Sequence, residues 1–299
     1  MQDGRPDEDH PTSPVRYQDT GVPKYEYTYI PITMTPTTVA VVNLKGGVGK
    51  TTTAVHLAAA AFHSGEAALL IDLDPQASAT DHLVEEAPDA ANAGRWLVGA
   101  CSLGEAIIEA RPAGRRARFD LAPSGGMAMS EAEVRLTARG SKKTFGRLLR
   151  AAPEAERYDV IVLDTGPGLN HLLLNALYAA DLVICPVELQ MAAIQGLRRL
   201  RDTLEFVAEE DGVEPRVLLL PTNADGRVRE SAELLAVLQR EFGKVPQGQV
   251  LTPIRYSSSL SRAYGARLTI YELDPRDRAA EDYANVFRQI RQPNGSQAS

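Results

Sequence analysis

The chain has 299 residues, of which 44% are hydrophobic and 24% are charged. This composition is close to that of an average globular protein, so it excludes a collagen, a coiled coil and a wholly disordered chain. Acidic residues outnumber basic ones and give a formal net charge of −7, which argues against a protein that binds nucleic acid over its whole surface.

Residues 1–36 are polar and rich in proline, threonine and acidic residues. No hydrophobic period runs through the first half of this segment, so we expect a disordered tail with a short extended stretch at Tyr25–Ile32. Acidic residues stand where a secretion signal needs positive charge, and no run in the chain reaches the roughly 18 apolar residues of a membrane span. These features predict a cytoplasmic protein that does not act at a membrane.

From Thr38 onward, short apolar runs alternate with longer helical patterns. Uninterrupted apolar runs of about four to eight residues are typical of strands that are buried on both faces. The expected strands are Val39–Asn43, Ala67–Leu73, Phe119–Ala122, Val160–Asp164, Leu182–Val187, Val217–Pro221 and Gln249–Ile254. The expected helices are Lys50–Ser64, Ser102–Ala110, Glu131–Ala151, Leu172–Ala179, Ile194–Glu210, Val228–Phe242, Ser257–Ala263 and Arg278–Ile290.

This alternation predicts an α/β fold in which helices flank a mostly parallel, twisted sheet. No linker interrupts the pattern, so we expect a single domain over residues 37–292. The last residues, 293–299, are polar and contain glycine and serine, and we expect them to form a flexible tail.

The strongest functional signal is the sequence KGGVGKTT at residues 45–52, which follows the first apolar run and opens the first helical pattern. Its glycines let backbone N–H groups approach phosphates, and the amino terminus of the helix favours an anion. We therefore expect ATP to be bound by Gly46, Gly47, Val48, Gly49, Lys50, Thr51 and Thr52. In a phosphate loop, Lys50 bridges the β- and γ-phosphates, Thr51 coordinates Mg²⁺ and Thr52 contacts the α-phosphate. The additional lysine, Lys45, is placed to act on a phosphate of a neighbouring subunit.

Acidic residues end two of the other apolar runs. The sequence IDLDPQAS contains Asp72 and Asp74, and the run VIVLD ends in Asp164. Carboxylates at the carboxyl ends of parallel strands face the crevice in which an open α/β sheet binds its ligand. After a phosphate loop, Asp164 is expected to hold Mg²⁺ through water. For Asp74, which precedes Pro75, capping of a helix is the alternative role.

Together these motifs resemble the ParA/MinD superfamily of P-loop ATPases, whose phosphate loop has a deviant Walker A sequence. The later segments LLPTNADGR at 219–227 and LSRAYG at 260–265 resemble the ParA/Soj-type partition proteins within it. The resemblance covers about Thr37–Ile290. It implies a P-loop fold and hydrolysis of ATP with Mg²⁺ as the cofactor.

The resemblance also assigns roles to single residues. It implies that Lys45 reaches the nucleotide of the partner subunit across an ATP-sandwich homodimer. It implies that Asp74 helps to activate the attacking water and that Asp72 lies near the shell of Mg²⁺. Asn223 and the backbone beside it are the implied contacts of the adenine. In this set Lys45, Lys50 and Asp74 are the expected catalytic residues, and Thr51, Asp72 and Asp164 surround the metal.

The chain departs from the family pattern at two places. The family follows the aspartate equivalent to Asp164 with one residue and two prolines, whereas here Gly166 replaces a proline and predicts a more mobile loop. The usual Glu-Ala-Pro of the later segment is Arg262-Ala263-Tyr264. The cysteines Cys101 and Cys185 do not match the pair that holds an iron–sulfur cluster in some relatives, so we expect two reduced thiols.

As a function, the resemblance implies an ATPase that dimerises on ATP, binds DNA non-specifically, partitions DNA and is stimulated by a ParB-like adaptor on the nucleoid. The candidate DNA-binding residues are Arg198, Arg199, Arg201, Arg227 and Arg229, with Arg255, Arg262 and Arg267 further along the chain. The alternative for these arginines is a solvated helix face on which they pair with acidic residues such as Glu205. Two other functions stay open: an ATPase that positions a protein cargo, and a metabolic or maturation ATPase.

Overall fold

The computed structural model describes residues 35–110, 119–190, 199–207, 215–225, 229–242 and 249–291. In these residues the strands form one sheet with the order β3-β4-β2-β5-β1-β6-β7-β8. The strands are β1 (Thr37–Val41), β2 (Ala68–Leu73), β3 (Ile108–Glu109), β4 (Asp120–Ala122), β5 (Val160–Thr165), β6 (Leu182–Glu188), β7 (Arg216–Thr222) and β8 (Gln249–Val250). Every neighbouring pair is parallel except β3 with β4.

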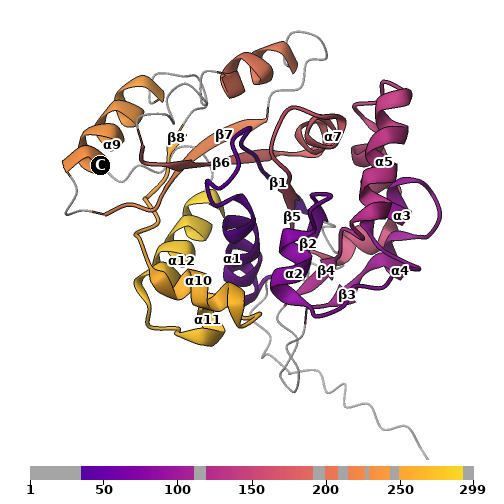
Figure 1. Ribbon diagram of the computed structural model, residues 1–299, viewed down its shortest axis with the longest axis horizontal. Helices are drawn as coiled ribbons and strands as arrows, with labels where there is room; N and C mark the ends of the chain where they lie inside the picture. The colour runs from indigo at the N-terminus through magenta and orange to yellow at the C-terminus, as the bar shows by residue number, and fades with distance from the viewer. Residues whose placement is uncertain are drawn as a thin grey trace, which may run out of the picture. The chain divides into compact units, whose positions relative to one another are not determined.

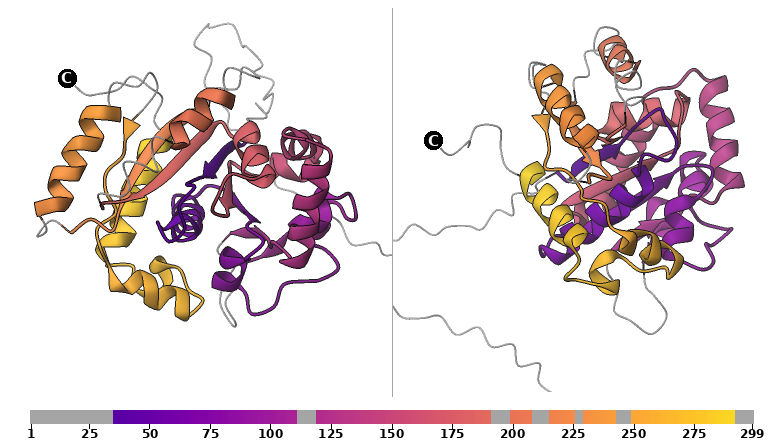
Figure 2. Two further views of the ribbon diagram at one scale, coloured as in Figure 1. Left: turned by 45° about the horizontal axis from the view of Figure 1, so that its top comes forward. Right: turned by 60° about the vertical axis from the view of Figure 1, so that its left-hand side comes forward.

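Helices cover both faces of this sheet. They are α1 (Lys50–His63), α2 (Ser78–Leu83), α3 (Ala93–Leu97), α4 (Leu103–Ala106), α5 (Met127–Ala138), α6 (Thr144–Ala151), α7 (His171–Ala179), α9 (Arg229–Phe242), α10 (Ser258–Gly265), α11 (Ile270–Leu273) and α12 (Arg278–Arg291), with a helical segment at 199–207 and a 3₁₀ turn at Pro153–Arg157. Figure 1 shows α1 beside α12 and α3 beside α5, and both views of Figure 2 keep the yellow α12 next to the indigo α1.

The alternation of side chains along the strands explains this two-faced packing. On β1, Val39 and Val41 point into a core that they share with α1 and α12, whereas Ala40 points into a core shared with α5, α6 and α7. All residues of β2 and β5 are buried, as expected for strands covered on both faces. The apolar runs of the sequence therefore predicted the central strands correctly.

The expected α/β fold with a mostly parallel sheet is confirmed, but some expected elements are wrong. The single helix expected at Glu131–Ala151 is two helices, α5 and α6. The break is at Gly140, whose φ of 57° lies in the left-handed region that favours glycine. The N–H of Ser141 donates back to the carbonyl of Leu136 (3.1 Å), which closes the end of α5.

The second error concerns the helix expected at Ser102–Ala110. Ser102 and Glu105 form a capping box that starts α4, but this helix ends at Ala106. The next residues, Ile108–Glu109, instead pair with β4 as a short edge strand. The strand expected over Gln249–Ile254 ends at Val250. The short helices α2, α3 and α11 had no apolar period long enough to predict them.

Several expectations fall on residues that the structure does not describe. They are the tail before residue 35, the tail after residue 291, and the two ends of the helix expected at Ile194–Glu210. Within the described residues, no helix is both long enough and apolar enough to cross a membrane.

Candidate active site

The phosphate loop connects β1 to α1 at the carboxyl edge of the sheet. Gly47 and Gly49 have φ values of 76° and 90°, so both glycines occupy a backbone region that other residues rarely adopt. Asn43 accepts a hydrogen bond from the N–H of Lys45 (2.9 Å) and donates to the carbonyl of Pro186 at the end of β6 (2.8 Å). The hydroxyl of Thr222, the last residue of β7, donates to the carbonyl of Val48 (3.1 Å).

These contacts fasten the loop to two strand ends, which keeps its backbone N–H groups in place. Sequence reasoning missed Asn43 and Thr222. Each is a polar residue that directly follows or ends an apolar run, and this position is the signal that could have identified them.

The two lysines of the loop lie in opposite surroundings. Lys50 is buried, and its Nζ donates to the carbonyl of Lys45 (2.9 Å). Burial lowers the pKa of Lys50, while the carboxylates of Asp164 and Asp74 oppose this effect. The side chain of Lys45 is exposed, and no carboxylate among the described residues forms an ion pair with it. Only Lys50 therefore faces the chain's own carboxylates.

Asp164 is fully buried on β5, where the strand register places it beside Val41 of β1 and Asp72 of β2. Its pKa lies well above its ordinary value because the carboxyl is buried and because Asp72 is close. Lys50 and the hydroxyl of Thr51 lie near it, but neither carboxylate oxygen accepts a hydrogen bond of regular geometry from the described residues. A buried carboxylate with two unsatisfied oxygens beside a threonine hydroxyl suits Mg²⁺, which prefers oxygen ligands.

The carboxylate of Asp72 has a different arrangement. One oxygen accepts the N–H of Asp74 (3.0 Å), and the other accepts both the N–H and the hydroxyl of Thr80 (2.9 and 2.7 Å). Burial raises the pKa of Asp72 to about 6. Because each oxygen already accepts a protein donor, the structure gives Asp72 a part in holding the loop between β2 and α2, in addition to its place near Asp164.

Asp74 lies on that same loop and is almost fully buried. Its carboxylate accepts the N–H of Gln76 (2.9 Å), and its carbonyl accepts the hydroxyl of the buried Ser124 (2.6 Å). The cap residue of α2 is Ala77, and no side chain caps that helix. The alternative role of Asp74 as the cap of the next helix is therefore wrong, because the carboxylate closes only a local turn.

Gly166, the residue that replaces a family proline, approaches this carboxylate closely. A Cβ atom built on Gly166 would lie 2.9 Å from Oδ1 of Asp74, which is too close for a real contact. A side chain at position 166 would therefore require the Asp74 carboxylate to move. The glycine was expected only to make the loop more mobile, but in the structure it also lies directly against the Asp74 carboxylate.

Replacing Gly166 by alanine is expected to displace the Asp74 carboxylate and to slow ATP hydrolysis by about 10- to 100-fold, because shifts of about 1 Å in a reacting group have effects of this size. The measurement is the steady-state rate of phosphate release at saturating ATP. Gly265→Ala is the matched control, since a Cβ atom there meets nothing within 4 Å. Equal rates for both variants would contradict the role given to Gly166.

A pocket of about 410 Å³ opens beside the phosphate loop. Its walls are the loop, the ends of β6 and β7, and the segment that leads into α10. Asn223 lies in this wall, and its φ of 59° is in the left-handed region. Its side-chain amide donates to the carboxylate of Glu188 (3.1 Å), a pocket residue that was not predicted from the sequence. Tyr256 and Tyr264 also line the pocket and are about half exposed. The volume is in the range of small-ligand sites, so a nucleoside can be accommodated next to the phosphate loop.

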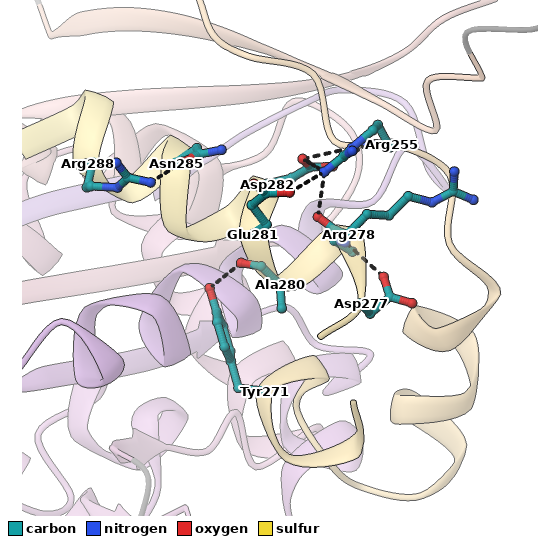
Figure 3. A network of polar contacts seen from close by, with 10 residues as sticks. Arg255, Tyr271, Asp277, Arg278, Ala280, Glu281, Asp282, Asn285 and Arg288 are labelled. Carbon is teal, nitrogen blue, oxygen red and sulfur yellow. Dashed lines mark hydrogen bonds and ion pairs between the residues drawn. The ribbon is translucent and has the colours of Figure 1, made fainter. Parts of the chain in front are cut away.

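Arg255 lines the same pocket, but its guanidinium is occupied (Figure 3). It donates to the buried Asp282 of α12 (2.7 Å) and to the exposed Glu281 (2.9 Å), and these partners raise its pKa. Arg255 was expected to add to a basic DNA-binding surface. The structure shows instead that it joins the pocket wall to α12 by an ion pair.

The five candidate DNA-binding arginines are only partly described. Arg199 and Arg201 are exposed on the helical segment at 199–207, but Arg201 pairs with Asp202 (3.3 Å) and Glu205 (3.4 Å). The alternative of a solvated helix face paired with acidic residues is thus the observed arrangement of Arg201. Arg198 and Arg227 lie outside the described residues, and only the backbone of Arg229 at the start of α9 is described.

A phosphate loop between the first strand and helix, a buried lysine, and strand-end carboxylates at one edge of a parallel sheet define a P-loop nucleotide-binding protein. A family model described as "AAA domain" matches residues 36–216. The chain belongs to this family and, within it, to the ParA/Soj-type P-loop partition ATPases.

Relatives of this type are similar along most of their length. The sporulation initiation inhibitor protein Soj of Bacillus subtilis is 31% identical over 84% of this chain and 97% of its own length. The chromosome-partitioning ATPase Soj of Thermus thermophilus is 33% identical over 84% of this chain and 94% of its own length. The chain is accordingly an ATP-hydrolysing P-loop enzyme.

Solved structures share the fold. Apo McdA of Cyanothece superposes with a TM-score of 0.72 at 23% identity, covering 85% of this chain and 98% of McdA. Cobyrinic acid a,c-diamide synthase of Mycobacterium smegmatis, with a bound ATP analogue and magnesium, has a TM-score of 0.68 at 26% identity and covers 85% of this chain and 94% of its own. Nucleotide and Mg²⁺ binding are thus found among the relatives with this fold.

Proposed function

We propose that this chain is a DNA partition ATPase that forms an ATP-sandwich homodimer, binds DNA without sequence preference and hydrolyses ATP under stimulation by a ParB-like adaptor. The observation that carries the proposal is that the two lysines of the phosphate loop lie in different surroundings. Lys50 is buried toward Asp164 and Asp74, whereas Lys45 is exposed at the outer side of the same loop. A cation in that position is available to a nucleotide held by a second copy of the chain.

In the proposed site, each residue has a task that its position allows. Lys50 and the backbone of residues 46–52 bind and orient the phosphates, and Asn223 contacts the base. Thr51 and Asp164 hold Mg²⁺, which when bound neutralises charge on the phosphates. Asp74 orients the attacking water. Phosphoryl transfer depends mainly on such positioning and charge stabilisation, so no further catalytic group is required.

The proposal is tested by retardation of random duplex DNA with the full chain, in the absence of nucleotide and with ADP, ATP or a slowly hydrolysed ATP analogue. We expect retardation only with ATP or the analogue, and a steep loss of binding as salt is raised, because non-specific binding releases counterions from phosphates. Absence of DNA binding in every nucleotide state, together with ATP-dependent dimerisation, would contradict DNA partition.

A protein cargo is the second candidate function. The observation that favours it is that Arg201 and Arg255, two of the cations expected to contact DNA, are ion-paired within the chain. An ATPase of this kind would dimerise on ATP without needing a strongly basic surface. The outcome in which the dimer forms but does not bind DNA supports this candidate.

A further inference from the structure

A basic stretch lies at residues 135–150 and includes none of the candidate DNA-binding arginines. It contains six basic residues and no aspartate or glutamate. The six are Arg135, Arg139, Lys142, Lys143, Arg147 and Arg150. The stretch includes the end of α5, the turn at Gly140 and nearly all of α6. We name residues 135–150 the basic elbow.

Most basic side chains of the basic elbow are exposed. Arg139, Lys143 and Arg147 are exposed, and Lys142 is half-buried. Arg135 is neutralised by Glu131 one turn earlier on α5 (2.5 Å). By contrast, neither Arg139 nor Arg147 forms an ion pair with any carboxylate in the described part of the chain. Unlike Arg201 and Arg255, these two arginines keep their charge available to a partner.

The backbone of the basic elbow is held firmly from α7, which lies beside α5 (Figure 1). The buried Asn175 of α7 accepts the N–H of Phe145 (3.0 Å) and donates to the carbonyl of Ser141 (2.8 Å). The ring of His171, the first residue of α7, also contacts that carbonyl (3.4 Å). Because α7 starts shortly after Gly166, the loop that follows Asp164 leads directly to the support of the basic elbow.

The basic elbow adjoins the helical segment at 199–207. Nζ of Lys142 lies 5.1 Å from the centre of the Phe206 ring, which is half exposed. Arg199 on the same segment is exposed. The elbow and this segment therefore form a neighbouring set of cations on the helix-covered face that includes α5 and α7.

We propose that the basic elbow contacts the phosphate backbone of duplex DNA, with Arg139 and Arg147 as its principal cations. This inference rests on the proposed DNA binding and moves its main surface from the late helices to α5 and α6. Several neighbouring exposed cations fit non-specific binding, which requires neutralised phosphates and no sequence contacts. The connection through α7 gives the loop after Asp164 a physical route to the DNA-binding surface.

The test compares Arg139→Ala/Arg147→Ala with the control Arg276→Ala/Arg288→Ala, which removes the same charge at exposed positions near and on α12. Binding to random duplex DNA is measured with the slowly hydrolysed ATP analogue over a salt series. We expect the elbow variant to bind on the order of tenfold more weakly and to lower the salt slope by about two, since each phosphate contact contributes about one. The control keeps the wild-type slope.

Arg139→Lys/Arg147→Lys should restore most of the slope, because it keeps both charges, and thermal unfolding verifies that all variants fold. If the alanine variant keeps the wild-type slope while wild type binds DNA, the basic elbow proposal is wrong and the proposed function stands. If wild type binds no DNA in any nucleotide state, the proposed function itself fails. If the variant keeps DNA binding but loses stimulation by an adaptor, the elbow is a protein surface and the proposal is overturned.

Discussion

Lys50→Ala is expected to lose at least about a hundredfold in ATP affinity or hydrolysis. Removal of one preorganised cation or donor from a site of developing charge commonly has an effect of this size. Here the loss is compounded because Lys50 is the buried cation opposite Asp164 and Asp74. Without it, two carboxylates face the phosphates with no protein charge to offset them. Fluorescent-nucleotide titration and phosphate release measure the two parts of the effect.

Lys50→Arg separates charge from shape in the same experiment. An arginine keeps the positive charge, but its planar guanidinium cannot occupy the space of a buried ammonium that donates to the carbonyl of Lys45. We therefore expect Lys50→Arg to be almost as inactive as Lys50→Ala. Wild-type affinity in either variant would show that the phosphates lie elsewhere.

Asp74→Asn is expected to bind ATP with near wild-type affinity and to hydrolyse it about 100- to 1,000-fold more slowly. Asparagine preserves the size of the side chain and can still accept the N–H of Gln76, so the local turn is retained. What it loses is the carboxylate charge, to which we have assigned the orientation of the attacking water, and groups with that task contribute about this much to a rate. Single-turnover hydrolysis, measured beside nucleotide affinity, separates the two effects.

Ser124→Ala is the matched comparison for Asp74→Asn. It removes only the hydroxyl that holds the carbonyl of Asp74 and leaves the carboxylate in place. A smaller loss of rate is expected, because the loop is loosened without losing its charge. If Asp74→Asn hydrolyses ATP at the wild-type rate, the catalytic role of Asp74 is refuted.

The parallel sheet and the phosphate loop could be predicted because local sequence determines both. Apolar runs such as Val160–Asp164 have no other stable place than a strand covered on both faces, and a glycine-rich loop before a helix has few other uses. The roles of the carboxylates could not be predicted so well. Asp72 and Asp164 both lie at the carboxyl ends of apolar runs, within a residue of where each strand ends. Their partners distinguish them: Asp72 accepts a hydrogen bond from Thr80, whereas Asp164 has no donor of regular geometry among the described residues.

Long-range contacts also explain the failed expectations for the arginines. Arg255 looked like a free cation in the sequence, yet Asp282, which neutralises it, lies 27 residues later on α12. The basic elbow was hidden because its residues were expected to form one continuous helix, over which the charges would have spread around the axis. The turn at Gly140 ends α5 and starts a second helix, α6, and both helices pack against α7.

Asp164 and Lys50 lie on a central strand and on the helix after the loop, whereas Asp74 and Gly166 lie on two loops that touch. The first pair belongs to the sheet and to α1, whereas the contact between the second pair depends on the positions of two loops. A movement of either loop would therefore displace the Asp74 carboxylate and leave Lys50 and Asp164 in place. Under the roles proposed for these residues, such a movement would change the rate of ATP hydrolysis without changing the affinity for the nucleotide.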